Sequence, residues 1–255
     1  MKRQVSRVLI FRRPPKRRAR MMGAVTPPLA KFAGLLADGT RATFCMALLD
    51  GRAWTAGELA RYAGVAASTA SEHLTLLVAG GLLAEEHQGR HRYVRLATPR
   101  VAELIEEMSV YADAGSPAPP KSLRAAAASE AMARARTCYD HLAGRLGVRL
   151  TDTMASRGFL GTEDGFALTA RGREWLESEV GATLVGGGRR PLVRACLDWT
   201  ERRPHLAGTA GAALCQRLHE RGWVVRIGSQ RAVRVTPEGE AGLRELLGLS
   251  PADLA

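Results

Sequence analysis

The sequence lacks any apolar run close to the roughly 20 residues that a membrane-spanning helix needs. An apolar stretch near the N-terminus, residues 8–11, is also far too short for a secretory signal. These absences indicate a cytoplasmic protein without membrane contact. Because the chain has 255 residues, of which 46% are hydrophobic, it can bury one or two cores of ordinary size.

Cysteine is scarce as well, and its four copies form no Cys-x-x-Cys pair, so zinc-finger and thioredoxin chemistry have no support. The sequence also has no nucleophile elbow, Walker loop or dinucleotide-binding turn, and the glycines at 186–188 follow no strand that could complete a phosphate cradle. We therefore expect no enzyme, and we predict no catalytic residue, resident metal or cofactor.

Acidic residues are absent from the first twenty positions, which hold nine of the 37 lysines and arginines. Subtracting these nine from the formal net charge of +12 leaves only +3 for the rest of the chain. We interpret residues 1–28 as a basic, disordered arm. This arm contacts the DNA backbone, is a bare extension, or reflects a start codon set upstream of Met21 or Met22.

What the chain does contain, at residues 54–96, is a pattern of helix, tight turn, helix and hairpin. Thr55 and Glu58 form a capping box that starts the first helix, and Gly64 suits the positive φ of the turn. The second helix begins at Ala67. Its buried face has apolar residues at helical spacing: Ala70, Leu74, Leu77 and Val78.

The opposite face of the second helix is polar and rich in hydroxyl groups, which suits contact with bases and phosphates. Its candidate DNA contacts are Ser68, Thr69, Ser71, Glu72, His73 and Thr75. Gly80-Gly81 ends the helix, and Gln88-Gly89 between two apolar-rich runs predicts a hairpin, or wing. The wing adds further candidate DNA contacts: Gln88, Arg90 and Arg92.

Residues 29–111 resemble the ArsR-type (ArsR/SmtB-like) winged-helix repressors of prokaryotes. The resemblance rests on these motifs: Leu59-Ala60, Gly64-Val65, Ser68, Ser71, His73-Leu74, Leu77, Gly80-Gly81-Leu82, Gly89-Arg90, Tyr93 and Leu96. It implies a DNA-binding domain with the second helix in the major groove. Two departures concern Glu72, where the family usually has Gln, and the surroundings of His87, where it usually has a basic residue.

Two further helices are expected before this pair, separated by Asp38-Gly39-Thr40, and one after the wing, from Thr98-Pro99 to about Tyr111. In the resembled family the first helix and the helix after the wing build a dimer. The latter has an apolar face that serves a dimer or the interior of one subunit: Val101, Leu104, Ile105, Met108 and Tyr111. A homodimer would place two recognition helices about one DNA turn apart on a near-palindromic operator.

A proline-rich linker at residues 112–121 separates this domain from a C-terminal half that repeats itself. Residues 141–147 recur as residues 205–211, and at this offset eight of twenty columns are identical. We therefore predict a C-terminal domain at residues 122–255, built from two repeats at about 122–185 and 189–250.

Each repeat also follows the order of motifs in the first domain: a turn glycine, a break glycine and a Thr-capped helix. The corresponding residues are Gly147, Gly158 and Thr169, then Gly211, Gly222 and Thr236. The predicted fold is mainly α with short β-hairpins, one winged helix-turn-helix plus two further winged-helix-like units. The second helices of the repeats should be six residues shorter than that of the first unit.

We interpret the C-terminal half as a ligand-sensing or assembly domain, because its second helices lack a hydroxyl-rich outer face. The alternative is auxiliary DNA contact through basic residues of the third hairpin: Arg226, Arg231 and Arg234. The second hairpin carries Glu163 and Asp164, which would repel phosphate.

Cys138 and Cys196 occupy matching contexts in the two repeats, each with an Asp two residues later. The pattern indicates a candidate effector or redox site, or a metal site with His205. Its residues are Cys138, Asp140, His141, Cys196, Asp198 and His205. The alternative is that both thiols face the core, since free Cys is among the most buried residue types. The motifs of the metal-sensing ArsR-type proteins are absent, so the resemblance does not imply metal sensing.

Together these features predict a cytoplasmic, homodimeric transcriptional repressor that binds double-stranded DNA and is controlled by a small-molecule effector or partner at its C-terminal domain. The alternative is a winged-helix adaptor that binds a protein or effector and does not read DNA sequence. An enzyme using Cys138 or Cys196 is a third hypothesis, and it would require thiol-dependent turnover.

Overall fold

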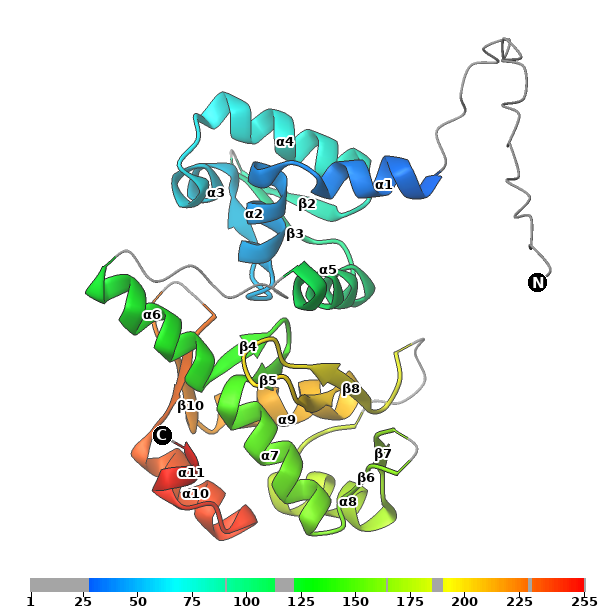
Figure 1. The fold of residues 1–255 in the computed structure, drawn as a ribbon, viewed down its shortest axis with the longest axis vertical. Coiled ribbons are helices and arrows are strands. Elements are labelled where there is room, and N and C mark those ends of the chain that lie inside the picture. The colour runs from blue at the N-terminus through cyan, green and yellow to red at the C-terminus, as the bar shows by residue number, and fades with distance from the viewer. Residues whose placement is uncertain are drawn as a thin grey trace, which may run out of the picture.

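The computed structural model describes residues 28–89, 91–112, 122–163, 165–184, 190–228 and 231–254. Two halves lie one above the other, the N-terminal half with the recognition helix at the top and the C-terminal half below (Figure 1). Nearly all of the predicted arm and linker, residues 1–27 and 113–121, lie outside the described residues. None of the described helices is long and apolar enough to span a membrane.

The N-terminal half is a winged helix-turn-helix, as predicted. Its elements are α1 (Pro28–Leu36), α2 (Gly39–Leu48), β1 (Trp54–Thr55), α3 (Ala56–Ala63), α4 (Ala67–Ala79), β2 (Leu83–Gln88), β3 (His91–Leu96) and α5 (Pro99–Ala112). The three strands form an antiparallel sheet in the order β1-β3-β2. The wing turns at Gly89, whose φ of +58° fits the two-residue hairpin loop, and Gln88 pairs with His91.

Local signals in the sequence account for these elements. Thr55 and Glu58 form both hydrogen bonds of the capping box at the start of α3. Gly64 ends α3 with a φ of +68°, and its N–H donates to the carbonyls of Ala60 and Arg61. The helices then enclose one core whose fully buried members include Phe44, Leu48, Leu59, Leu74, Leu77, Leu82 and Val94. This core fixes α4 against the sheet and leaves its other face outside.

The C-terminal half confirms the internal repeat. The first repeat contains α6 (Leu123–Arg134), β4 (Arg136–Cys138), β5 (His141–Ala143), α7 (Gly144–Ser156), β6 (Leu160–Gly161), β7 (Ala167–Leu168) and α8 (Ala170–Glu174), which continues as the π-helical η1 (Trp175–Val180). The second contains β8 (Arg194–Leu197), β9 (Pro204–Ala207), α9 (Gly208–Glu220), β10 (Val224–Arg226), β11 (Val233–Val235), α10 (Pro237–Leu247) and α11 (Pro251–Leu254). Both follow the order hairpin, helix, hairpin, helix.

The predicted helix caps of the repeats are present. Thr169 accepts a hydrogen bond from the Gly172 N–H at 2.9 Å, and Thr236 accepts one from the Gly239 N–H at 3.0 Å. Each threonine hydroxyl also donates to a carbonyl just after the preceding helix, that of Gly158 or Gly222. These bonds join each hairpin to its closing helix.

The prediction of a helix-turn-helix inside each repeat is wrong in one respect, because a β-hairpin replaces the first helix. Gly147 lies within α7, and its Cβ position would be 2.4 Å from the Leu142 carbonyl, so the glycine serves a close strand contact instead of a turn. Gly211 does the same in α9 against Leu206. The second helices are not shortened either, since α7 and α9 have 13 residues, as α4 does.

The two repeats exchange their packing partners. Helix α7 packs on β9 of the second repeat and α9 packs on β5 of the first, while β5 and β9 lie against each other. The Thr151 hydroxyl of α7 accepts a hydrogen bond from the Leu206 N–H at 2.8 Å. One hydrophobic core therefore spans both repeats, with Leu142, Leu146, Met154, Trp175, Leu206, Leu214, Leu218 and Leu243 among its buried members.

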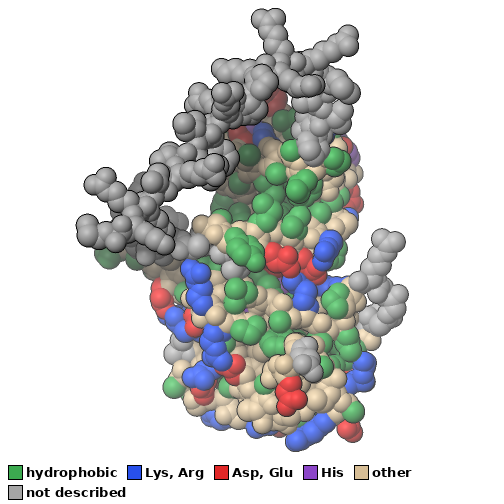
Figure 2. All heavy atoms as spheres, turned by 45° about the vertical axis from the view of Figure 1, so that its right-hand side comes forward, with side chains coloured by type: hydrophobic (Ala, Val, Ile, Leu, Met, Phe, Trp, Pro, Cys, Tyr) green, Lys and Arg blue, Asp and Glu red, His purple; other side chains and the backbone are tan. Residues whose placement is uncertain are grey.

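Helix α5 connects the two halves. Arg194 of β8 forms ion pairs with Glu103 at 3.7 Å and Glu107 at 3.1 Å on α5. Arg226 of β10 donates to the Asp50 carbonyl at 2.9 Å. Figure 2 shows acidic and basic side chains gathered near the middle of the visible face, where the halves meet. Arg231 is buried and not placed for auxiliary DNA contact, whereas Arg226 and Arg234 are exposed, so DNA contact through these two stays a prediction.

Candidate DNA-binding interface and a buried cluster of Cys and His

Helix α4 lies at the outer edge of the N-terminal half (Figure 1). Ser68, Ser71, Glu72 and Thr75 are exposed and Thr69 is half-buried, whereas Ala70, Leu74 and Leu77 are buried on the other face. The Thr75 hydroxyl donates to the Ser71 carbonyl at 2.9 Å, which leaves its oxygen able to accept. A row of short polar side chains therefore lies along one accessible side of a 13-residue helix.

His73 differs from the other predicted contacts because it faces the neighbouring helix. Its Nδ1 lies 3.3 Å from Nη1 of Arg41 and 3.8 Å from Oδ1 of Asp38, and 18% of its side chain is exposed. Arg41 in turn donates to the carbonyls of Leu35 and Gly34. We infer that His73 positions α4 against the start of α2, a role that the sequence prediction missed.

The wing also keeps part of its charge within the domain. Arg92 pairs with Glu85 on the opposite strand, with Nη2 2.6 Å and Nε 2.7 Å from Oε2. Gln88 is exposed at the end of β2, and the predicted contact Arg90 lies outside the described residues. An exposed carboxylate can hold an Arg in this way without burying either charge.

Asp38 is a residue whose role the sequence prediction understated. The sequence indicates only that Asp38 lies in the break between two helices. In the structure its carboxylate caps α2 by accepting a hydrogen bond from the Arg41 N–H at 2.9 Å. That hydrogen bond and the nearby positive charges hold the pKa of Asp38 below its usual value. The Asp-Gly-Thr order before a helix is the signal that could have revealed the cap.

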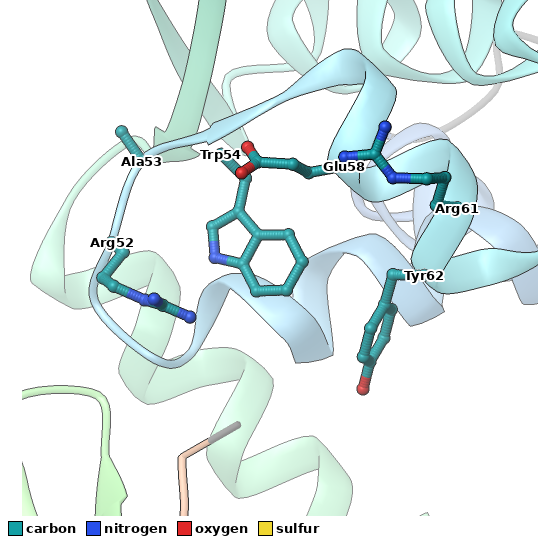
Figure 3. Close-up of a pocket in the computed structure, with 6 residues that line it drawn as sticks. All are labelled: Arg52, Ala53, Trp54, Glu58, Arg61 and Tyr62. Atoms are coloured by element: carbon teal, nitrogen blue, oxygen red, sulfur yellow. The ribbon is translucent and has the colours of Figure 1, made fainter. Parts of the chain in front are cut away.

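A shallow pocket beside α3 is lined by Arg52, Ala53, Trp54, Glu58, Arg61 and Tyr62 (Figure 3). Two of its charged side chains already stabilise the fold. Glu58 is held by the capping box, and Arg52 pairs with Asp50 at 2.6 Å. The Trp54 and Tyr62 rings meet edge to face with centroids 5.6 Å apart. The pocket is therefore part of the surface beside α3, the first helix of the helix-turn-helix, and its contacts stabilise that helix.

The candidate effector or redox residues of the C-terminal half do come together. The ligand atoms of Cys138, His141, Cys196 and His205 all lie within 4.8 Å of one another, and all four side chains are buried. Within each hairpin the Cys is paired directly with the His: Cys138 with His141, and Cys196 with His205. The two imidazole rings stack with centroids 5.1 Å apart. Each repeat thus supplies one thiol and one imidazole.

Asp140 and Asp198 stand behind the two histidines. Oδ1 of Asp140 is 3.3 Å from Nδ1 of His141, and Oδ2 of Asp198 is 3.7 Å from Nδ1 of His205. Arg190 binds Asp140 through two nitrogens, and Arg136 pairs with Asp198 at 2.9 Å. Burial acts to raise the pKa of Asp140, but the hydrogen bonds from Arg190 and His141 lower it to about 2.

Comparison with known protein families finds a match in the region from α2 to β2. A family described as a helix-turn-helix domain matches residues 36–86. The chain is 37% identical to the uncharacterized HTH-type transcriptional regulator YdfF of Bacillus subtilis over 227 residues, 88% of this chain and 99% of that protein. It is 36% identical to the HTH-type transcriptional regulator CmtR of Mycobacterium tuberculosis over 80 residues, 31% of this chain and 67% of that protein.

Among solved structures, the N-terminal half is similar to a homodimeric winged helix-turn-helix DNA-binding domain from Mycobacterium bovis. The sequences are 29% identical, the match covers 35% of this chain and 82% of that one, and the TM-score is 0.32. The similarity to YdfF, in contrast, extends through both halves of the chain.

Proposed function

Because this chain belongs to the ArsR-type helix-turn-helix transcriptional regulators, we propose that it is a dimeric repressor that binds a near-palindromic operator. The observation that carries the proposal is the exposed, hydroxyl-rich face of α4 beside the wing, on a helix whose other face is fixed in the core. A 13-residue helix is about 20 Å long, enough to lie in a major groove. The protein acts on DNA in the cytoplasm.

Sequence recognition is assigned to the N-terminal and middle parts of α4. Ser68, Thr69, Ser71 and Thr75 offer hydroxyls to base edges and phosphates, and Glu72 can accept from a cytosine amino group. The wing adds three further proposed contacts, Gln88, Arg90 and Arg92. To bind a phosphate, Arg92 must first break its ion pair with Glu85.

Dimerisation is supported by apolar surface that one chain leaves uncovered. Helix α1 has no buried residue although it is mostly apolar, and Leu29 is 77% exposed. On α5 the predicted face is divided: Ile105 is buried and Val101 and Leu104 are half-buried, whereas Met108 and Tyr111 remain exposed. Figure 2 shows hydrophobic side chains gathered on the visible face of the N-terminal half. A second copy of the chain that covers α1 and α5 would remove this surface from water.

Control from the C-terminal half is proposed to pass through α5. Its Glu106 carboxylate is buried, and the thiol of Cys138 interacts with it. Burial raises the pKa of this carboxyl group. Since α5 also borders the proposed dimer surface, an effector or partner that moves the hairpins β4-β5 or β8-β9 would change how two α4 helices are spaced.

Fluorescence anisotropy with a labelled duplex from the region upstream of the protein's own gene tests DNA recognition. We expect binding that weakens steeply with salt and is at least about 1000-fold tighter than to a scrambled duplex. Ser68→Ala/Ser71→Ala should weaken binding to the specific duplex about 30-fold, which corresponds to two lost polar contacts. Gln216→Ala, an exposed change on α9, is the matched control.

Equal affinity for the specific and scrambled duplexes would instead support the adaptor that does not read DNA sequence. Equal loss in the α4 and α9 variants would show that α4 is not the recognition helix. The oligomeric state is measured separately. A monomer that still binds the operator would contradict the proposed dimer and leave the proposed DNA recognition intact.

A further inference from the structure

The cluster of Cys138, His141, Cys196 and His205 has the composition and closeness of a metal site. Two sulfur and two nitrogen atoms converge from two hairpins that lie far apart in the sequence. A tetrahedral zinc ion with bonds of about 2.0–2.3 Å holds neighbouring ligand atoms about 3.3–3.8 Å apart. Because all four ligand atoms already lie within 4.8 Å of one another, small side-chain rotations close the remaining gap.

The histidines are oriented as ligands usually are. Nδ1 of His141 lies within hydrogen-bond distance of Asp140, whereas Nδ1 of His205 lies 3.7 Å from Asp198 without a hydrogen bond, and among the described residues neither Nε2 has a hydrogen-bond partner. A carboxylate on one ring nitrogen fixes the ring and directs the other nitrogen to the metal. Two separate repeats thus each bring a Cys, a His and a nearby Asp to one point, and the Asp is hydrogen-bonded to its His only in the first repeat.

Charge and burial also fit a divalent ion. The four side chains are at most 5% exposed, so polar ring nitrogens without partners are enclosed there at a cost to folding. Two thiolates would neutralise one divalent cation, and two neutral imidazoles would complete its shell without adding charge. Mixed sulfur and nitrogen ligands in a closed, four-ligand shell favour zinc as a structural ion.

We propose that Cys138, His141, Cys196 and His205 bind one Zn²⁺ ion that joins the two repeats of the C-terminal half. The ion holds hairpin β4-β5 against hairpin β8-β9, where β5 and β9 already meet. Binding releases to solvent the two thiol protons and the extra proton of any ligand imidazole that is charged, and no bond other than the four to the metal is formed. Its residues lie outside the segment that matches the helix-turn-helix family, so metal binding can be measured without DNA.

Metal content of the full chain, purified without an affinity tag, gives the first test. Mass spectrometry of the metals is expected to find one zinc per chain, and Co²⁺ exchanged into the site should produce the visible bands of a tetrahedral ion and the near-ultraviolet bands of thiolate bonding. Cys138→Ser and Cys196→Ser should each remove the zinc and the thiolate bands, whereas Cys45→Ser and Cys215→Ser should change neither. The last two cysteines are buried but lie outside the cluster.

A second variant keeps the four metal ligands and changes only the carboxylate that is hydrogen-bonded to His141. Asp140→Asn is expected to weaken zinc affinity about tenfold, measured by competition with a chromophoric chelator. The proposal is overturned if fully reduced protein binds neither Zn²⁺ nor Co²⁺, if Cys215→Ser removes as much metal as Cys138→Ser, or if Cys138 and Cys196 form a disulfide in protein isolated from a reducing cytosol. If the ligand variants do not fold, the stoichiometry and the cobalt spectrum of the unmodified protein decide.

Discussion

The N-terminal winged helix and the C-terminal repeats share helices of equal length and similar hairpins, but they use them in opposite ways. Helix α4 packs one face and leaves a polar face outside, whereas α7 and α9 are enclosed by strands of the other repeat. Seven residues of α7 are buried, including both of its glycines, against three of α4. The difference shows that α4 keeps an accessible polar face because no second repeat covers it.

Glycine substitutions should give the largest difference in stability between the two halves. Gly208 has a φ of +82°, and an added Cβ would lie 2.9 Å from the carbonyl oxygens of Pro191 and Leu192, so Gly208→Ala should cost about 3 kcal/mol or more of the free energy of unfolding. Gly64→Ala, at a φ of +68° with open space around it, should cost about 1 kcal/mol. Urea unfolding of both variants measures this, and equal losses would mean that the close contact with the segment before β8 is not decisive.

The uncovered apolar surface of the N-terminal half gives the next prediction. Leu29→Glu/Met108→Glu places charges on α1 and α5 and should weaken dimerisation about 100-fold or more. Ile227→Glu, on a residue of the C-terminal half that is 39% exposed, should leave the dimer unchanged. Sedimentation equilibrium distinguishes the two, and a double variant that remains as dimeric as the unmodified chain would place the interface elsewhere.

The contact between the halves should have a smaller effect. Arg194→Ala removes both ion pairs to α5 and leaves Glu103, whose side chain is 9% exposed, without this partner, so we expect a loss of about 1–2 kcal/mol. Arg203→Ala breaks a more exposed pair with Asp152 inside the C-terminal half and should cost at most about 0.5 kcal/mol. Thermal unfolding followed by circular dichroism compares them. A larger loss for Arg203→Ala would contradict the assigned interface.

The smallest effect concerns pH. Hydrogen bonds from the backbone and the hydroxyl of Thr55 lower the pKa of Glu58, so its capping contribution is present above the ordinary pKa of Glu and is lost as pH falls through the lowered value. The destabilisation by Glu58→Ala should therefore shrink under acid. Thr169→Ala and Thr236→Ala should show no such change, because glycines occupy the position that Glu58 holds. A series of melting temperatures against pH tests this.

Most elements of the N-terminal half could be predicted because the interactions that start and end them are local. The capping box, the turn at Gly64, the wing turn at Gly89 and the start of α5 at Pro99 each depend on residues within a few positions of one another. The partners of His73 and Arg92 could not be predicted in the same way. Asp38 and Glu85 reach them only through the folded contacts of α2 and of the wing.

The C-terminal half was harder because its strands are short and depend on distant residues. Strands β4 and β5 have three residues each, which is too few to show an alternating pattern, and their leucine and alanine also fit a helix. The sequence repeat did identify Cys138 and Cys196 as equivalent. Each Cys lies opposite a His within its own hairpin, and the two Cys–His pairs meet only through the packing of β5 on β9.

The exchange of partners between the repeats has a consequence for synthesis on the ribosome. The N-terminal half contains every residue of its own core except the flanking Tyr139, so it can fold soon after it emerges. The first repeat cannot do so, because after α7 ends at Ser156 another 51 residues (207 − 156) must be made before β9 is complete, which takes roughly 3–10 s at usual elongation rates. During that interval the apolar side of α7 is open to chaperones, and both repeats then fold as one unit.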